Sequence, residues 1–301
     1  MTAATLTKSP TTAWRHRSQF RMATRELARD RVAVGALVVL TLVVLVAIFA
    51  PLISPYDPLV GDPTMRLLPP GTPGHLLGLD GQGRDILSRL IWGGRYSLTV
   101  AIVPVLSAGV VALVLGMVAG YSGGRWGELV MRLLDVVFAF PIVLFAIAIA
   151  AVLGPGLVNS MLAIGITLVP YMARVVYTAT VQESGKDYVE AARAAGLTEV
   201  EILGKQLLPN VLSPLVVYAT TLAGLVIVLA AGLSFLGVGI TPPAPDWGVM
   251  TSDGRQVLLE GYAHVATIPG LMIFIVAIAF NLLGDGIRDA LDPHKQTGSR
   301  T

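Results

Sequence analysis

Two long stretches without a charged side chain constrain the fold of this chain most strongly. No Asp, Glu, Lys or Arg occurs in residues 136–173 or in residues 206–245. A helix that spans a bilayer needs about 20 predominantly apolar residues, so each stretch has room for one or two spanning helices. Charged residues make up only 13% of the chain and the mean hydropathy is +0.73, whereas soluble domains carry about 25% charged residues. These features predict an all-α polytopic membrane protein.

The order of apolar and polar segments predicts six transmembrane helices. Helices are expected because a segment in lipid must satisfy its backbone hydrogen bonds within itself. The expected spans are 32–52, 97–120, 130–153, 157–182, 211–237 and 266–288. Residues 54–95 and 239–264 are too polar or too rich in proline and glycine to span. We expect both segments to lie outside the membrane on the same side.

The first 31 residues carry seven Lys or Arg side chains in front of an apolar run, 32–50. A cleaved signal peptide is one interpretation, but this run is longer than the 7–15 or so apolar residues of such peptides, and no A-x-A site follows. An uncleaved first helix fits better, and orientation alone explains the basic segment without a nucleic-acid-binding role. With both termini in the cytoplasm, 16 of the 21 Lys and Arg residues lie on cytoplasmic segments, as the positive-inside rule requires.

A hydrophilic segment, 183–210, interrupts the apolar blocks and is predicted to form a helix, a turn and a second helix. Asp187 is expected to cap the first helix, with Glu190 three residues further on. Gly196 suits the left-handed conformation that ends a helix, and Thr198 with Glu201 predicts a second capping box. The alanines at 191, 192, 194 and 195 leave the first helix slim, which favours its insertion into a groove on a partner.

The same segment, YVEAARAAGLTEVEILGKQLLP at 188–209, resembles the EAA loop of permease subunits in bacterial ATP-binding-cassette importers. One departure is Gln206, where isoleucine is usual. The resemblance implies that this loop receives force from a separate ATPase. The residues that it implicates in coupling to the ATPase are Asp187, Tyr188, Glu190, Ala191, Ala192, Gly196, Leu208 and Pro209.

A second resemblance lies in HLLGLDGQGRDILSRLIWGGRYSL at 75–98. This stretch is similar to the one before the second helix in dipeptide, oligopeptide and nickel importer permeases, specifically the second, C-type permease of each pair. Further matches are Gly120-Tyr121, Met131-Arg132 with Asp135, Phe140-Pro141, Leu233 to Gly237, Trp247-Gly248 and Asn281 to Gly286. Leu76 and Leu79 depart from the pattern, in which proline and threonine are more common.

Membership of that family would imply a type I importer (MetI-like) transmembrane domain with an extra N-terminal helix and external loop. The corresponding divisions are a basic cytoplasmic tail (1–31), a first helix with an extracytoplasmic segment (32–94), the transmembrane domain with its coupling loop (95–290), and a cytoplasmic tail (291–301). The implied partners are a homologous second permease, two ATPase subunits and an extracytoplasmic substrate-binding protein. The implied location is the bacterial inner membrane.

No cofactor is expected in this chain, so ATP and Mg²⁺ would be bound by the partner subunits. Gly185-Lys186 does not form a phosphate-binding loop, because the positions that require glycine and Ser or Thr hold Thr180 and Asp187. Cysteine is absent, and the histidines at 16, 75, 264 and 294 lack metal-ligand spacing. No metal site is therefore predicted, and no catalytic residue either.

Several interpretations stay open on the sequence alone. The trio Gly83-Arg84-Asp85 could dock the binding protein, or Arg84 and Asp85 could simply cap a helix that begins near Ile86. Gly116 and Gly120 favour close helix packing or could line a cavity. An ion-coupled secondary transporter would need ionisable residues within its spans, and an intramembrane enzyme would need a nucleophile–base pair; the sequence suggests neither. Di- or oligopeptides are the leading substrate, with nickel and other small solutes as alternatives.

Overall fold

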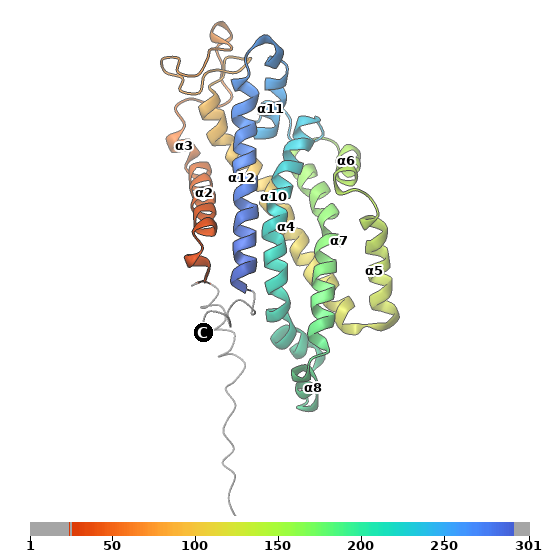
Figure 1. The fold of residues 1–301 in the computed structure, drawn as a ribbon. Coiled ribbons are helices and arrows are strands. Elements are labelled where there is room, and N and C mark those ends of the chain that lie inside the picture. Colours follow the sequence, from red (N-terminus) through yellow and green to blue (C-terminus); the bar gives the residue numbers. More distant parts are fainter. Residues whose placement is uncertain (1–23, 25, 292–301) are drawn as a thin grey trace, which may run out of the picture.

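The computed structural model describes residue 24 and residues 26–291 of the 301. Within this part the chain is helical, with three isolated bridges and no strand. Most of the two predicted terminal tails falls outside the described residues. Figure 1 shows an elongated bundle with residues 54–85 and α11 at one end and α8 at the other. The main helices are α2 (Arg31–Ile48), α3 (Ala50–Ile53), α4 (Ile86–Ser122), α5 (Gly124–Phe138), α6 (Ile142–Leu153), α7 (Leu157–Ser184), α8 (Asp187–Ala194), α9 (Glu199–Glu201), α10 (Leu208–Phe235), α11 (Trp247–Arg255) and α12 (His264–Leu291).

Five helices are long and apolar enough to cross a membrane, and α5 with α6 makes a sixth if this bent pair is one span. The prediction of six spans therefore agrees with the structure when α5 and α6 are counted as one span, and the count is five otherwise. The prediction of one continuous helix over 130–153 is wrong, because α5 and α6 meet at 86°. Pro141 is the residue at the break. Its ring fixes φ and its lack of an N–H removes a helical hydrogen bond, which explains the break.

The second spanning helix begins 11 residues before its predicted start, at Ile86 instead of residue 97. The predicted boundary between residues 94 and 95 therefore lies inside α4. Residues 86–95 were assigned to the external segment because they contain arginines and a glycine pair. In the structure the missing side chain of Gly93 lets Trp247 pack closely against α4, since a Cβ on Gly93 would lie 2.6 Å from the Trp247 ring. Polar residues can start a long helix here because other parts of the chain supply their hydrogen-bond and ion-pair partners.

The core of the bundle is formed by α4 against α7 and by α10 against α12, with α2 along α12. Gly116 and Gly120 lie where α4 meets α7. A Cβ at Gly116 would come within 2.6 Å of the Val176 Cβ, and one at Gly120 within 2.9 Å of the Thr180 Cβ. The close-packing interpretation of the two glycines is therefore confirmed.

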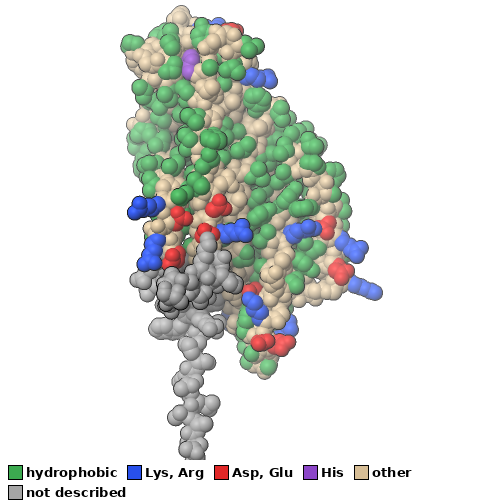
Figure 2. Space-filling view, in the orientation of Figure 1, with side chains coloured by type: hydrophobic (Ala, Val, Ile, Leu, Met, Phe, Trp, Pro, Cys, Tyr) green, Lys and Arg blue, Asp and Glu red, His purple; other side chains and the backbone are tan. Residues whose placement is uncertain are grey.

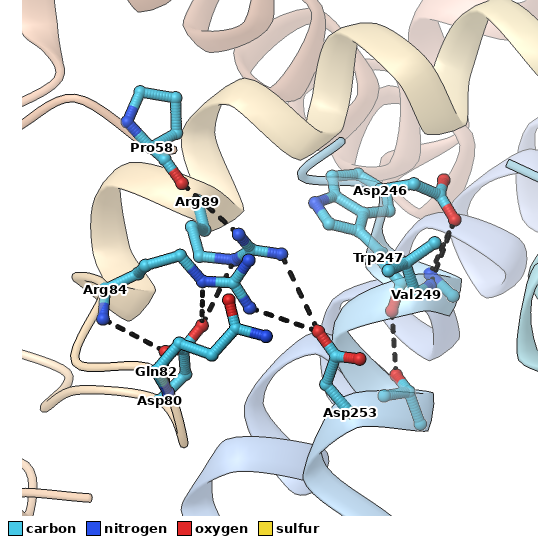
Figure 3. A network of polar contacts seen from close by, with 11 residues as sticks. Pro58, Asp80, Gln82, Arg84, Arg89, Asp246, Trp247, Val249 and Asp253 are labelled. Carbon is cyan, nitrogen blue, oxygen red and sulfur yellow. Dashed lines mark hydrogen bonds and ion pairs between the residues drawn. The ribbon is translucent and has the colours of Figure 1, made fainter. Parts of the chain in front are cut away.

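A buried ion network joins the segment before α4 to α11 (Figure 3). Arg84 Nε lies 2.7 Å from Asp80 Oδ2, and its Nη2 lies 3.1 Å from Asp253 Oδ2. Arg89 Nη1 donates to the Pro58 carbonyl at 3.2 Å, and both arginines are almost fully buried. This network explains why residues 54–85, α4 and α11 form one compact cap.

The start of α11 is attached directly to α4. Asp246 caps α11 by accepting from the backbone of Gly248 and Val249, and Ser97 Oγ donates to the same carboxylate at 2.6 Å. The Trp247 indole donates to the Leu90 carbonyl at 2.9 Å. Through these bonds the segment between α10 and α12 is fixed to the start of α4.

Candidate functional site: the loop between α7 and α10

The first turn of α8 begins one residue earlier than the sequence suggests, at Asp187. Lys186 occupies the N-cap position without a side-chain bond to the helix backbone, so the prediction that Asp187 caps α8 is wrong. The Lys186 ammonium instead pairs with Glu183. Asp187 and Glu190 lie in the first turn and Arg193 in the last, an order that complements the helix dipole.

The end of α8 has the geometry predicted for Gly196. Its φ is +83°, a conformation that costs other residues roughly 1–2 kcal/mol. Gly196 N donates to Arg193 O at 2.9 Å and Leu197 N donates to Ala192 O at 3.2 Å. These two bonds make a Schellman motif, which satisfies the last carbonyls of the helix and sharply reverses the chain.

The second half of the loop runs without a break into α10. The predicted Thr198–Glu201 capping box is present, but a π-helical segment (Ile202–Leu207) follows α9 and leads directly into α10 at Leu208. Pro209 lies in the first turn of α10, where its missing N–H is not needed. The predicted second helix is thus the start of a spanning helix, continuous with α10.

Tyr188 holds α8 against two spanning helices. Its hydroxyl donates to Glu183 Oε2 on α7 at 2.8 Å and accepts from Asn210 Nδ2 on α10 at 3.2 Å. Burial and the Glu183 carboxylate raise the pKa of Tyr188 to about 12, so the phenol stays neutral near pH 7. Beside it, Val189 is fully buried and Ala192 nearly so. The inner face of α8 is therefore fixed by both polar and apolar contacts.

A third attachment comes from Arg193. Its guanidinium stacks over the ring of Tyr121, in the last turn of α4, at 5.3 Å from the ring centroid. Contact with the Tyr121 hydroxyl is the main cause that raises the pKa of Arg193, so this side chain stays charged. Together with Tyr188, it connects α8 to α4, α7 and α10.

The opposite face of α8 is open to solvent. Asp187, Glu190, Ala191 and Ala194 are exposed, and on α9 Val200 is 78% exposed. Two carboxylates thus flank a surface of small side chains, which allows another protein to approach the helix backbone closely. Of the predicted coupling residues, Ala192 and Tyr188 face inward, Leu208 is half-buried and Pro209 is exposed.

The residues proposed for docking the binding protein lie inside the opposite end of the bundle. Gly83, Arg84 and Asp85 are all buried. Asp85 caps α4 by accepting from Ser88 N at 2.7 Å, which confirms the capping interpretation for that residue. A docking role for the trio stays a prediction, although their side chains do not form an exposed surface.

Within residues 24 and 26–291, no cluster of three or more metal-ligating side chains occurs. His75 instead pairs with Asp85, Nδ1 to Oδ1, at 3.0 Å. The ring of His264 packs edge-on to Tyr262. The other two histidines, at 16 and 294, lie outside the described residues.

Comparison with known families decides what kind of protein carries this loop. Residues 112–297 match the model described as "Binding-protein-dependent transport system inner membrane component", which is more than half of the chain. The chain belongs to this family. A second model, "N-terminal TM domain of oligopeptide transport permease C", matches residues 18–70, which include α2. Members are multi-pass inner-membrane permeases of ATP-binding-cassette importers, which generally lack catalytic activity and act with ATPases and binding proteins.

Curated family members resemble the chain over most of its length. The "Di/tripeptide transport system permease protein DppC" of Pseudomonas aeruginosa is 42% identical over 274 residues, covering 89% of this chain and 90% of the relative. The "Glutathione transport system permease protein GsiD" of Pectobacterium atrosepticum is 40% identical and covers 92% of each chain. Among solved structures, a chain of the "MetNI methionine ABC transporter" covers 69% of this chain and 98% of its own at a TM-score of 0.56 and 21% identity. That likeness supports the MetI-like fold.

Three residues that attach α8 had no role in the sequence prediction: Glu183, Asn210 and Tyr121. Two of them flank the EAA-like segment, and the third lies far away in the sequence at the end of α4. Tyr121 was noted only as part of a similar motif, because sequence spacing does not reveal which helix end lies beside the loop. Asn210 comes directly after the segment, near one end of a spanning helix, and this position was the one available signal.

Proposed function

We propose that this chain is the transmembrane permease subunit of an ATP-driven importer for di- and oligopeptides. It would form half of the translocation pathway beside a homologous permease. Two ATPase subunits would bind ATP and Mg²⁺, and an extracytoplasmic binding protein would deliver the substrate. This chain would contribute no catalytic residue. The peptide substrate is supported by the names of the relatives, which transport dipeptides, di- and tripeptides, and glutathione.

The observation that carries this proposal is the geometry of α8. One face is attached to α4, α7 and α10 through Tyr188 and Arg193, while the other face is open. A rigid partner that binds the open face of α8 would therefore move three spanning helices together. Moving a two-state protein from about 1:99 to 99:1 takes roughly 5.5 kcal/mol, whereas one carboxylate at a helix N-terminus contributes about 0.3–1 kcal/mol. Coupling would thus rely on rigid-body movement of the docked helix.

The proposed orientation places α8 and both termini in the cytoplasm. Figure 2 shows charged side chains gathered toward the α8 end, below a broad apolar middle zone. The absence of native cysteine allows a direct test. Glu190→Cys and Leu259→Cys variants would be labelled in intact cells with a membrane-impermeant maleimide. Labelling is expected at 259 and not at 190; the reverse pattern would overturn the orientation.

The function is tested by reconstituting the chain in lipid vesicles with its partner permease, ATPases and binding protein. ATPase activity and uptake would be measured with dipeptides, longer peptides, glutathione and nickel in turn. Peptide-loaded binding protein is expected to stimulate both activities. Stimulation by nickel alone would support the proposed importer but contradict the proposed peptide substrate. Failure of any ATPase to assemble with the permeases would contradict the coupling role.

A further inference from the structure

A groove between α2 and α4 lies at the end of the bundle that carries residues 54–85. The two helices meet closely where Ala47 faces Gly94, since a Cβ on Gly94 would lie 3.2 Å from the Ala47 Cβ. Beside this contact is a cavity of about 320 Å³. Its lining includes Val44 and Ile48 from α2 and Arg95, Ile102 and Val103 from α4.

The walls of the groove are apolar except near Arg95. The one hydroxyl in the lining belongs to Thr99, and it donates to the Arg95 carbonyl at 2.6 Å. It is therefore satisfied within α4. One helical turn beyond Val103, Leu106 is 62% exposed, and Val110 after it is 64% exposed. An apolar track thus continues along α4 from the groove toward the middle of the bundle.

Arg95 differs from the other arginines at the start of α4. Arg84 and Arg89 are buried and paired with carboxylates, whereas Arg95 is exposed and lies over the Trp92 ring at 5.2 Å. Among residues 24 and 26–291, no hydrogen bond or ion pair involves its guanidinium. This cation therefore has capacity for an anionic ligand.

The side chains around Arg95 indicate which anion would be available to it. Arg95 lines the groove together with Ile48, and apolar helix continues past this level, with Leu52 81% exposed. Trp92 beneath the guanidinium is typical of the zone where apolar chains meet headgroups. A cation at this boundary is stabilised when its side chain reaches phosphate.

We propose that the groove binds a phospholipid, with an acyl chain along Ile102 and Val103 and its phosphate on the Arg95 guanidinium. In the proposed orientation the lipid belongs to the outer leaflet. The site depends on the membrane location of the chain and is independent of which solute is transported. A lipid fits better than a second subunit because the groove combines a narrow apolar wall with one cation, the pattern that an acyl chain and its phosphate present together.

The proposal is tested by native mass spectrometry of the assembled importer, purified in mild detergent and supplied with phosphatidylglycerol or phosphatidylethanolamine. For Arg95→Gln, the retained phospholipid is expected to fall roughly fivefold, as for the loss of one Arg–headgroup contact. Arg95→Lys should retain part of the binding. Arg255→Gln is the matched control, because Arg255 also lies over an aromatic ring, that of Phe235, and is exposed. It should leave retention unchanged.

A second variant tests the groove without changing its charge. Val103→Trp would fill the cavity and is expected to reduce lipid retention, whereas Val152→Trp, at an exposed position on α6 away from the groove, is not. A photo-crosslinking residue at position 103 would identify the occupant directly. Equal lipid retention by the wild type and Arg95→Gln would overturn the proposal, and so would crosslinking of position 103 to the partner permease instead of lipid. Failed uptake alongside intact lipid binding would affect only the proposed transport function.

Discussion

The Tyr188 hydroxyl is the best place to test whether α8 transmits movement to the spanning helices. It joins Glu183 on α7 to Asn210 on α10 at 2.8 and 3.2 Å. The substitution Tyr188→Phe removes both bonds and keeps the ring. Val189 and Ala192 remain as apolar anchors, so we expect the loop to fold.

The expected magnitude follows from the two lost bonds. A hydrogen bond to a charged group contributes about 1.5–3 kcal/mol and a neutral one about 0.5–1.5 kcal/mol. We expect both hydrogen bonds to contribute near the lower end of these ranges, because the site is only half-buried and water can replace the hydroxyl. A net loss of about 1–2 kcal/mol changes the ratio of attached to detached α8 by a factor of 5–30. Uptake per ATP hydrolysed should fall, while binding of the ATPase to the exposed face should persist.

The assay measures peptide uptake and ATP hydrolysis in the same vesicles. Tyr56→Phe is the matched control, because it also removes one phenol bond, to the Gly74 carbonyl at 2.9 Å, at the far end of the bundle. A double-mutant cycle with Asn210→Leu should show strong non-additivity, since Asn210 contacts the same hydroxyl. Unchanged uptake per ATP in Tyr188→Phe, together with additive effects, would refute the role assigned to this contact.

The pKa of Tyr188 predicts how coupling should depend on pH in the same experiment. Its folded value of about 12 lies above the ordinary value of about 10, so the folded state favours the neutral phenol. The resulting stabilisation is fully present below about pH 10 and is lost as the pH rises through 12. Between pH 6 and 9, ionisation of Tyr188 should therefore cause no change in coupling.

Three further predictions concern other parts of the chain. No atom lies within 4 Å of a Cβ at Gly196, so Gly196→Asn should retain coupling while Gly196→Leu reduces it through backbone strain of about 1–2 kcal/mol; equal uptake per ATP in both would contradict this. Asp80→Asn should lower the free energy of unfolding by about 3–5 kcal/mol, because it leaves Arg84 buried with one carboxylate fewer, which thermal unfolding in detergent would measure. The half-exposed pair of Asp135 and Arg174 should contribute at most about 1 kcal/mol, and exchanging the two residues should restore what Asp135→Asn loses.

The number of spans could be predicted from the sequence because membrane helices need long uncharged runs. The start of α4 could not be predicted, because an arginine and a glycine pair are typical of a loop in sequence. Their partners, the Pro58 carbonyl for Arg89 and the Trp247 ring for Gly93, come from distant parts of the chain. The bend at Pro141 was missed for a related reason. The sequence is apolar on both sides of Pro141. Apolar composition indicates that a segment lies in lipid, but it does not indicate the direction in which the helix runs.

The candidate site shows the same division between local and distant contacts. Gly196 and the Thr198–Glu201 box follow from bonds between near neighbours in the sequence, and both were predicted correctly. The cap of α8 was misplaced by one residue: Lys186 precedes the helix and pairs with Glu183, while Asp187 lies in the first turn. Tyr121 was not given a role, since only the folded bundle brings the end of α4 beside α8.

The proposed coupling role requires a short helix to move as a rigid body. A helix of eight residues is marginal by itself in water, so it can act as a rigid body only if its neighbours hold it. Here Val189 anchors it in the core, while Tyr188 and Arg193 connect it to three spanning helices. Its solvent face carries the small side chains of Ala191 and Ala194 and the carboxylates of Asp187 and Glu190, so a partner can bind there without displacing Tyr188 or Val189. Because Tyr188 and Val189 hold the inner face and the open face uses other residues, the ATPase contact that we propose would leave the attachment of α8 to the bundle intact.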